Sequence, residues 1–187
     1  KNLDCFFAKI LKSKINFNKI NNKFDKFKFN IFFKFNFCEK NAMQSGGRID
    51  EFKNDYIIVS IGDYGALNWD AKEDYFFSDQ SNLGKIISIN LISKEIDVLS
   101  KGHRNPQGLI YVDKKNLIIN TEHGPKGGDE ININTLDTVK NFGWPIASYG
   151  IRYNGDDPFE KNHKNFSEPI KYYNPSIAPS QIIKKFN

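Results

Sequence analysis

The sequence predicts an all-β protein, and three observations lead to that prediction. Short apolar runs alternate with polar turns at near-regular spacing, which is typical of consecutive antiparallel strands. No segment repeats its apolar residues with helical spacing. A long polar loop at 63–82 is inserted between two of the runs. Strand-rich chains without intervening helices form sandwiches, barrels or propellers. Long loops between hairpins favour the propeller, in which such loops gather at one mouth of a central channel.

The first 45 residues differ in composition from the rest of the chain. They contain no glycine and are rich in Lys, Asn and Phe. Apolar stretches at 5–11 and 30–37 predict strands with an exposed edge. The alternative is low-complexity filler, but aromatic residues recur too often for a solvated tail. We therefore assign 1–45 to strands of an early blade.

From Gly46 onward, turns rich in glycine and polar residues separate a series of short apolar runs. The connectors at 53–55 and 113–116 have the composition of turns. The tail at 134–187 is loop-rich, and its four prolines after position 150 argue against central strands, because proline cannot donate to a sheet ladder. The predicted strands are 48–52, 56–61, 85–91, 95–99, 108–112, 117–120 and 130–133.

The composition fits one domain with a hydrophobic core. The 187 residues carry a net charge of +5, with 24 Lys and only three Arg, and Lys, Asn, Ile and Phe are over-used together. An A/T-rich genome produces this combination, and the lysines form no basic helix or aromatic-interleaved groove, so we expect no nucleic-acid partner. No apolar run is long enough to span a bilayer. The chain starts at Lys1 rather than Met, and we expect both ends to be cut.

Because Lys is the usual basic residue of this chain, the position of each Arg is informative. Arg48, Arg104 and Arg152 each follow a turn that contains glycine. A planar fork of donors that binds a carboxylate or quinone oxygen is one reason why Lys cannot substitute. We favour a role in a site for Arg104 and an ordinary surface position for Arg152, and we leave Arg48 open between the two.

Four glycine-containing elements follow one another in the second part of the chain. They are Gly-Gly-Arg-Ile at 46–49 with Ser-Ile-Gly-Asp at 60–63, Leu-Gly-Lys-Ile at 83–86, Gly-His-Arg-Asn-Pro-Gln-Gly at 102–108, and Glu-His-Gly-Pro-Lys-Gly-Gly-Asp-Glu-Ile-Asn at 122–132. The last continues through Asn-Phe-Gly-Trp-Pro at 141–145 and Tyr-Gly-Ile-Arg-Tyr at 149–153. With these elements in this order, residues 44–183 resemble the PQQ-dependent aldose sugar dehydrogenases, relatives of the soluble quinoprotein glucose dehydrogenase in the glucose/sorbosone dehydrogenase family.

The resemblance implies a six-bladed β-propeller with its cofactor in the axial channel. Complete members of the family are about twice as long, so we expect about half of a propeller, with 1–45 in an early blade and 46–187 in blades truncated at the C-terminus. An unclosed ring leaves blade edges unpaired. We therefore expect the isolated chain to aggregate or to fold only in part.

The resemblance also implies a site for PQQ and Ca²⁺. It places Arg104 and Asn105 against PQQ, with Gln107 beside them and Tyr153 next to the cofactor, although Tyr153 is equally suited to pack under a blade. The backbone carbonyls of Gly124 and Pro125 correspond to those that hold the cofactor's calcium. Glu130, together with the backbone carbonyl of Phe142, corresponds to a second, structural calcium site. We expect structural roles for His103 and His123 and a solvated position for His163.

The sequence departs from the family at the catalytic base. The family's base is a histidine four residues before the Arg of Gly-Arg, and Gln44 stands at that position. An amide cannot take up a proton. The aspartate that supports the histidine in the family is present as Asp63. Three explanations remain open: weak or absent catalysis, Asp63 acting as the base, or a misplaced local alignment, although no other His precedes His103.

The function implied is PQQ- and calcium-dependent oxidation of the anomeric carbon of an aldose to a lactone, with Arg104 stabilising developing negative charge. The electron acceptor is unknown, and the family implies a periplasmic or secreted location. A non-catalytic propeller that binds a sugar or the cofactor is the alternative that Gln44 favours, and a propeller scaffold without cofactor is a third. Cys5 and Cys38 pair if the protein is exported or stay as separate buried residues, and the sequence does not choose between these states.

Overall fold

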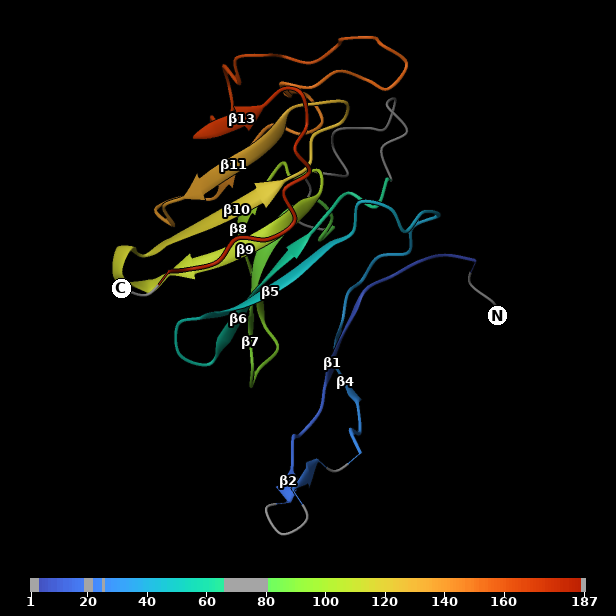
Figure 1. Cartoon of the computed structure of the whole chain (residues 1–187), viewed down its shortest axis with the longest axis vertical. Helices are drawn as coiled ribbons and strands as arrows, with labels where there is room; N and C mark the ends of the chain where they lie inside the picture. Colours follow the sequence, from blue (N-terminus) through green and yellow to red (C-terminus); the bar gives the residue numbers. More distant parts are fainter. Residues whose placement is uncertain (1–3, 19–21, 25, 66–80, 186–187) are drawn as a thin grey trace.

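The computed structural model describes residues 4–18, 22–24, 26–65 and 81–185. Within these ranges all regular structure is β-strand apart from one short 3₁₀ turn, η1 (Asp113–Lys115) (Figure 1). The all-β prediction is therefore confirmed. Most of the predicted loop at 63–82 lies outside the described residues. The strands are β1 (Lys9–Lys12), β2 (Phe17–Asn18), β3 (Lys23–Phe24), β4 (Asn30–Lys34), β5 (Gly46–Phe52), β6 (Tyr56–Ile61), β7 (Lys85–Asn90), β8 (Ile96–Lys101), β9 (Pro106–Val112), β10 (Leu117–Glu122), β11 (Asp129–Asn134), β12 (Lys140–Asn141) and β13 (Lys171–Tyr173).

Two sheets form the body of the molecule. One has the order β13-β11-β10-β9 and is antiparallel throughout. The other has the order β12-β8-β7-β6-β5 and is antiparallel except for the short parallel pair β12–β8. Strand β5 packs beside β9, and the backbone N–H of Tyr111 donates to the Asp50 carboxylate across this junction at 2.8 Å. The two sheets are thus neighbouring blades (Figure 1).

The alternation of side chains along β6 and β7 divides the core into two layers. Odd-numbered residues such as Val59 and Ile87 pack toward Phe35 and Phe37 of the N-terminal segment. Even-numbered residues such as Ile58 and Ile86 pack instead toward β9 and β10. Because successive side chains of a strand point to opposite faces, a central strand with both faces covered must be apolar at nearly every position.

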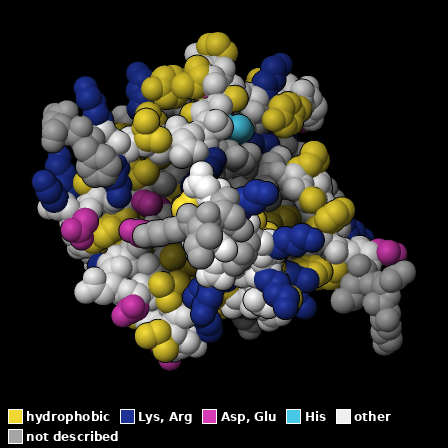
Figure 2. All heavy atoms as spheres, turned by 60° about the horizontal axis from the view of Figure 1, so that its bottom comes forward, with side chains coloured by type: hydrophobic (Ala, Val, Ile, Leu, Met, Phe, Trp, Pro, Cys, Tyr) yellow, Lys and Arg dark blue, Asp and Glu magenta, His cyan; other side chains and the backbone are white. Residues whose placement is uncertain are grey.

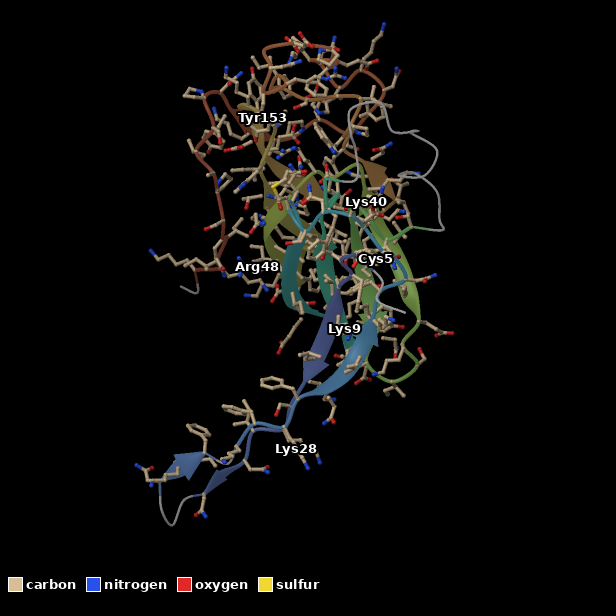
Figure 3. All side chains as sticks on the ribbon, turned by 90° about the vertical axis from the view of Figure 1, so that its right-hand side faces the viewer. Cys5, Lys9, Lys28, Lys40, Arg48 and Tyr153 are labelled. Carbon is tan, nitrogen blue, oxygen red and sulfur yellow. A yellow bond between two sulfur atoms is a disulfide. The ribbon has the colours of Figure 1, made fainter. Side chains whose placement is uncertain are left out.

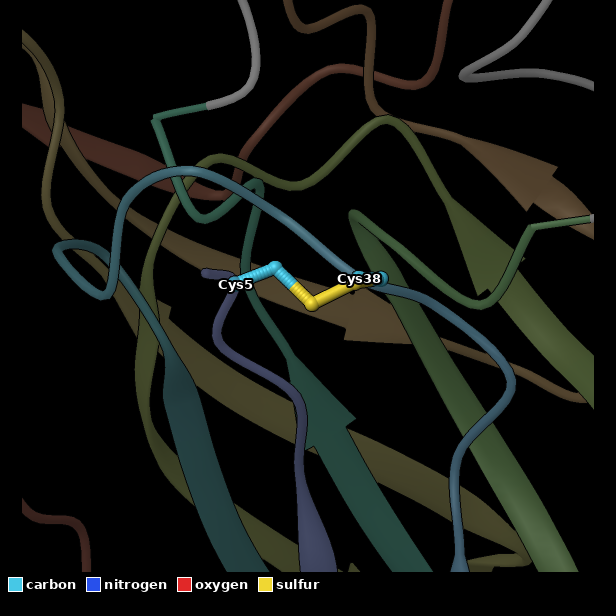
Figure 4. The surroundings of a disulfide bond; sticks show 2 residues. All are labelled: Cys5 and Cys38. Atoms are coloured by element: carbon cyan, nitrogen blue, oxygen red, sulfur yellow. A yellow bond between two sulfur atoms is a disulfide. The ribbon is translucent and has the colours of Figure 1, made fainter. Parts of the chain in front are cut away.

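The N-terminal segment forms a β-ribbon that projects from the body. Strand β1 pairs with β4, and β2 pairs with β3 at the far end of the ribbon (Figure 3). At its base Cys5 and Cys38 form a disulfide with their Cα atoms 5.3 Å apart (Figure 4). The pairing that the sequence left open is therefore present. Most large side chains of the ribbon are exposed, among them Phe17, Phe24, Phe27, Phe29 and Ile31.

Basic side chains are dispersed on the face of the molecule that Figure 2 shows. On the face shown in Figure 2, Lys and Arg side chains are dispersed among apolar ones and form no continuous stripe. The described residues contain no helix with the length and apolar character needed to cross a lipid bilayer.

Candidate functional site

The candidate site lies where four segments meet at one end of the two sheets. These are the segment before β5 and the loops that follow β6, β8 and β10. Backbone hydrogen bonds join them: the Asp63 N–H donates to the Arg104 carbonyl at 2.9 Å, and the His123 N–H donates to the Asn105 carbonyl at 3.1 Å. At Gly62 the backbones approach so closely that an added Cβ would overlap the Gln44 carbonyl oxygen. Only glycine permits this approach.

Arg104 is the centre of the site. Its side chain is buried, and Nη1 donates to the Gly124 carbonyl at 2.6 Å and to the His123 carbonyl at 3.2 Å. The guanidinium carbon lies 5.4 Å from the centre of the Trp144 ring. Nε is buried without a hydrogen-bond partner. Within the described residues no carboxylate oxygen lies within 4.0 Å of the guanidinium, so no carboxylate contacts Arg104 directly, although its charge acts on Asp63 across Gln44.

Gln44 joins Arg104 to Asp63. With its amide oriented to satisfy both neighbours, the nitrogen of Gln44 lies 2.5 Å from Asp63 Oδ1 and the oxygen lies 2.6 Å from Arg104 Nη2. The carboxylate of Asp63 also accepts from the Gly65 N–H at 2.8 Å and from Trp144 Nε1 at 2.9 Å. The three predicted residues therefore form one group, which we call the Gln44–Asp63–Arg104 cluster.

The carboxyl group of Asp63 is almost completely buried, at 1% exposed. Burial raises its pKa from the ordinary 3.8 to about 6. The Gly65 amide, the charge of Arg104 and the Trp144 indole act in the opposite direction, since each favours the ionised form. Asp63 is thus ionised at pH 7, but it takes up a proton far more readily than a solvated aspartate.

Asn105 and Gln107 lie beside the cluster and contact each other. Asn105 Oδ1 accepts from Gln107 Nε2 at 2.8 Å and from the Gly46 N–H at 3.2 Å. Arg48, whose role the sequence left open, donates through Nε to the Gln107 carbonyl at 2.9 Å and through Nη2 to the Ser180 carbonyl at 2.9 Å. The described contacts of Arg48 are therefore structural.

A small cavity of about 10 Å³ adjoins Arg104. Its volume admits one water-sized particle or a bare cation and excludes a tricyclic quinone. Burial raises the pKa of Glu130 well above its ordinary 4.5, and neighbouring carboxylates, led by that of Glu122, raise it further. The residues that line the cavity include Arg104, Glu122, Gly124, Glu130, Phe142 and Trp144.

His163 lies next to Glu130, and the expectation that it is solvated is wrong. Its side chain is fully buried, stacks on Tyr149 at 5.0 Å between ring centres, and places Nε2 3.5 Å from Glu130 Oε1. Burial lowers its pKa, so the ring is neutral at pH 7. Phe142 is buried as well, at 2% exposed. Tyr153, by contrast, is 65% exposed on the segment that follows the Lys126–Ile151 bridge (Figure 3).

His103 has the structural role that we expected. Its Nε2 lies 2.8 Å from Ser100 Oγ, and its Nδ1 lies 2.8 Å from Glu122 Oε1. The order Ser–His–Glu is that of a hydrolase triad, but all three side chains are buried. The other oxygen of Glu122 accepts the Arg104 N–H at 2.8 Å. The array therefore fixes the backbone at Arg104.

Sequence reasoning missed three residues of the site, namely Trp144, Glu122 and Asp129. Trp144 and Glu122 lie inside the quoted motifs, and each is buried and bonded to the Asp63 or Arg104 region. Asp129 is buried and accepts the Gly124 N–H at 3.1 Å. All three lie inside the glycine-containing motifs, with Asp129 directly after the Gly127-Gly128 pair, but only the fold reveals their partners.

The described residues contain no group of three or more His, Cys, Asp or Glu side chains arranged to hold a metal ion. A cation bound here must therefore take several of its ligands from backbone oxygens or water, as Ca²⁺ commonly does.

Comparison with known proteins identifies relatives of this chain. Residues 12–185 match the model of the family described as Glucose / Sorbosone dehydrogenase. The aldose sugar dehydrogenase YliI of Escherichia coli K12 is 36% identical over 148 residues, which is 72% of this chain and 38% of that protein. The chain spans well under half the length of the curated relatives it matches first.

Solved structures show the same fold. The soluble aldose sugar dehydrogenase from Escherichia coli, in its apo form, superimposes with a TM-score of 0.64 at 24% identity, over 91% of this chain and 51% of that one. The PQQ-bound aldose sugar dehydrogenase from Streptomyces coelicolor gives 0.59 at 20% identity, over 90% and 47%. The predicted propeller architecture is confirmed as part of a β-propeller. The chain belongs to the glucose/sorbosone dehydrogenase family of sugar dehydrogenases.

Proposed function

We propose that this chain carries part of the site of a PQQ- and calcium-dependent aldose dehydrogenase that oxidises the anomeric carbon to a lactone. The observation that carries the proposal is the buried Arg104 guanidinium, which no carboxylate of the described residues contacts directly and which lies 2.6 Å from the Gly124 carbonyl. A buried charge without a partner is costly, so a site that keeps one is suited to an anionic ligand. The family further suggests a periplasmic or secreted protein.

The donors present fit the chemistry of PQQ, which is a flat quinone with three carboxylates. Arg104 offers the unpartnered Nε, and Asn105 lies next to it with Gln107 hydrogen-bonded to its side chain. A planar guanidinium matches carboxylate and quinone oxygens better than an ammonium does. The exposed Tyr153 would have to reach the ligand from outside this cluster.

The carbonyls of Gly124 and Pro125 fit a calcium ion on one condition. A carbonyl oxygen has two lone pairs, and that of Gly124 uses one for Arg104. A divalent cation on the second would lie close to the guanidinium, and the two positive charges repel unless an anion lies between them. We therefore expect Ca²⁺ and PQQ to bind this part of the site together, each weakly without the other.

The second predicted calcium site fits a cation more directly. Glu130 is a buried carboxyl group surrounded by other carboxylates, and together with Phe142 it borders a cavity that admits a single ion. A cation there would offset the cost of ionising Glu130. His163 beside Glu130 is neutral, so it does not compete with a cation for the position next to the carboxylate.

The residues of the cluster have distinct roles in the proposed reaction. PQQ, when bound, supplies the quinone that accepts a hydride. Arg104 holds the anionic cofactor and stabilises negative charge that develops beside it. Gln44 donates to Asp63 and accepts from Arg104, so it orients both and cannot take a proton. Asp63 is the one side chain of the cluster that can accept the proton of the anomeric hydroxyl.

A non-catalytic propeller that binds the cofactor or a sugar is the second candidate. It is favoured by the amide of Gln44, which separates Asp63 from Arg104 and has both ends engaged. General-base catalysis contributes roughly 10²–10⁴-fold to rate, so its loss removes most turnover while binding remains. A scaffold without cofactor is the third candidate.

Titration of the complete protein with PQQ and calcium chloride, followed by dye-linked oxidation of a panel of aldoses, separates the three candidates. Saturable PQQ binding with turnover supports the dehydrogenase, binding without turnover supports the second candidate, and no binding refutes both. Arg104→Lys should weaken PQQ binding strongly because the fork of donors is lost. Arg152→Lys, the same change outside the cluster, should leave the affinity for PQQ unaltered.

A further inference from the structure

A segment far from the cluster in sequence is fixed to its loops by polar contacts. Residues 174–182, which we call the C-terminal strap, follow β13 and run along β9 and β10 (Figure 1). The strap has no regular secondary structure, so side chains of the body must hold it. Asp129, His123 and Arg48 contact it directly, through Ser176–Ala178, Pro179 and Ser180 respectively.

Asp129 makes the densest of these contacts. Its Oδ2 accepts from Ser176 Oγ at 2.6 Å, from the Ile177 N–H at 2.8 Å and from the Ala178 N–H at 2.7 Å. The side chain is completely buried. A carboxylate oxygen can accept several donors at once, whereas the amide nitrogen of asparagine accepts none. Asparagine could therefore accept on one side only, so holding the strap and the Gly124 N–H at the same time requires the carboxylate.

The other oxygen of Asp129 contacts the loop that serves Arg104. Oδ1 accepts the Gly124 N–H at 3.1 Å. That N–H belongs to the peptide group whose carbonyl is that of His123. Because a trans peptide is planar, with its N–H and C=O pointing in opposite directions, fixing the N–H on Asp129 directs the His123 carbonyl away from it. That carbonyl accepts from Arg104 Nη1 at 3.2 Å.

The side chain of His123 forms a second link between the loop and the strap. Its Nε2 donates to the Pro179 carbonyl of the strap at 3.1 Å, while its backbone carbonyl faces Arg104. The loop at 123–124 is thus held by the strap on one side and presents two carbonyls to the guanidinium on the other. Close packing at Gly127, where an added Cβ would meet the side chain of Asn174, brings the start of the strap against the same loop.

We propose that Asp129 is a positioning residue which clamps the C-terminal strap to the 123–124 loop and thereby directs the carbonyls of that loop at Arg104. The affinity of the site for its anionic cofactor and cation then depends on a segment at least 50 positions away in sequence from that loop. The link that Asp129 makes between the strap and the 123–124 loop is inferred from the hydrogen bonds alone. Its consequence for ligand affinity rests on the proposed function.

The first test needs no cofactor. Hydrogen–deuterium exchange of the complete protein should show Asp129→Asn accelerating exchange in 121–128 and 174–182 together, with β6 and β7 unchanged. Ser176→Ala removes one of the three strap donors and leaves the bond to Gly124, so it should have the same effect in weaker form. Asp137→Asn, in an exposed loop, is the matched control and should change neither segment. Acceleration confined to the strap, or spread evenly over the chain, overturns the proposal.

The second test measures PQQ affinity in the presence of calcium chloride. Loss of a group that orients ligands typically weakens affinity roughly 10–100-fold, and Asp129→Asn should do so while Asp137→Asn does not. Faster exchange with unaltered PQQ affinity would show that the clamp merely stabilises the fold. If the unaltered protein binds no PQQ, the proposed function fails, and the exchange experiment still decides whether the clamp positions the loop.

Discussion

Gln44 is the residue on which the choice between catalysis and binding depends. Its backbone adopts a positive φ of 59°, and its carbonyl accepts the Tyr64 N–H at 3.3 Å. Both ends of the amide are engaged, one by the carboxylate of Asp63 and one by the guanidinium of Arg104. A side chain held in this way is well placed to orient its neighbours but has no group that titrates.

Gln44→His should raise the turnover of the complete, PQQ-loaded protein, because an imidazole supported by Asp63 can act as a general base. We expect a gain of roughly 10²-fold, at the low end of what such catalysis contributes. Steady-state dye reduction measures it, and Gln44→Asn is the control that shortens the side chain without adding a base. Equal rates for the His and Asn variants would contradict a base at position 44.

Asp63 should give the stability of the cofactor-free protein a recognisable pH dependence. Its pKa is about 6 in the folded chain against the ordinary 3.8, so folding takes up a proton between these values. The contribution of Asp63 is complete below about pH 4 and is lost as pH rises through about 6, which amounts to roughly 3 kcal/mol at most. Asp63→Asn should therefore gain stability relative to the unaltered protein between pH 4 and 7.

Denaturant unfolding at several pH values measures this difference. Asp137→Asn is the control, because a hydrogen bond from Thr135 lowers the pKa of Asp137 below its ordinary 3.8 and so keeps its titration below that pH range. Parallel curves for the unaltered protein and Asp63→Asn from pH 4 to 7 would show that Asp63 isn't held in a desolvated environment.

At the scale of single residues, the sequence predicted which residues belong to the site better than it predicted the environment of each side chain. Arg104, Gly124 and Asp63 were expected in one site, and the structure brings their contacts together. His163 was expected in solvent, because a polar loop around a histidine gives no sign of the aromatic stack that buries it. The three strap donors of Asp129 lie 47 to 49 positions away, so no local pattern could reveal them.

Among the elements, the strands were the most predictable part of the chain. Alternation and turn composition predicted β5 to β11 to within a few residues, because a strand between two packed layers must be apolar over most of its length. The N-terminal segment was less predictable. Its Phe and Lys residues are compatible with both buried and exposed strands, and the structure buries Phe35 and Phe37 while exposing Phe24 and Phe29.

Gly62 lies in the loop that follows β6, where it approaches the loop that follows β8. We expect that this position tolerates no side chain. An added Cβ would overlap the Gln44 carbonyl oxygen and lie 3.0 Å from that of Arg104. Gly62→Ala should therefore separate these segments and destabilise the fold by about 1–3 kcal/mol or more. Gly47→Ala is the comparison, since its Cβ meets no atom within 4 Å and its cost comes only from a φ of +92°. Urea unfolding should rank Gly62→Ala as the more damaging change, and the opposite order would contradict the close approach.

At the scale of the whole molecule, the ribbon gathers several exposed aromatic side chains. Phe17 is 45% exposed, Phe24 61% and Phe29 63%. Apolar side chains on a projecting two-stranded ribbon favour association with other chains.

The 187-residue chain on its own should therefore self-associate at micromolar concentration, as sedimentation velocity would show. Phe24→Ser combined with Phe29→Ser should reduce association, because it removes apolar contact area without touching the body of the molecule. Lys23→Ser is the control for a change at the same tip that leaves the aromatic surface. A soluble monomer with a sharp cooperative melt would contradict this expectation.

The bond between Cys5 and Cys38 ties the two ends of the ribbon to each other across 33 positions of sequence. Such bonds persist where thiols become oxidised and are rare in a reducing cytosol. Recombinant material made in a reducing cytoplasm would carry two thiols instead, and its ribbon would be free to sample many more arrangements. The choice of expression host thus becomes part of the experiment, since it decides which form of the first forty residues is being studied.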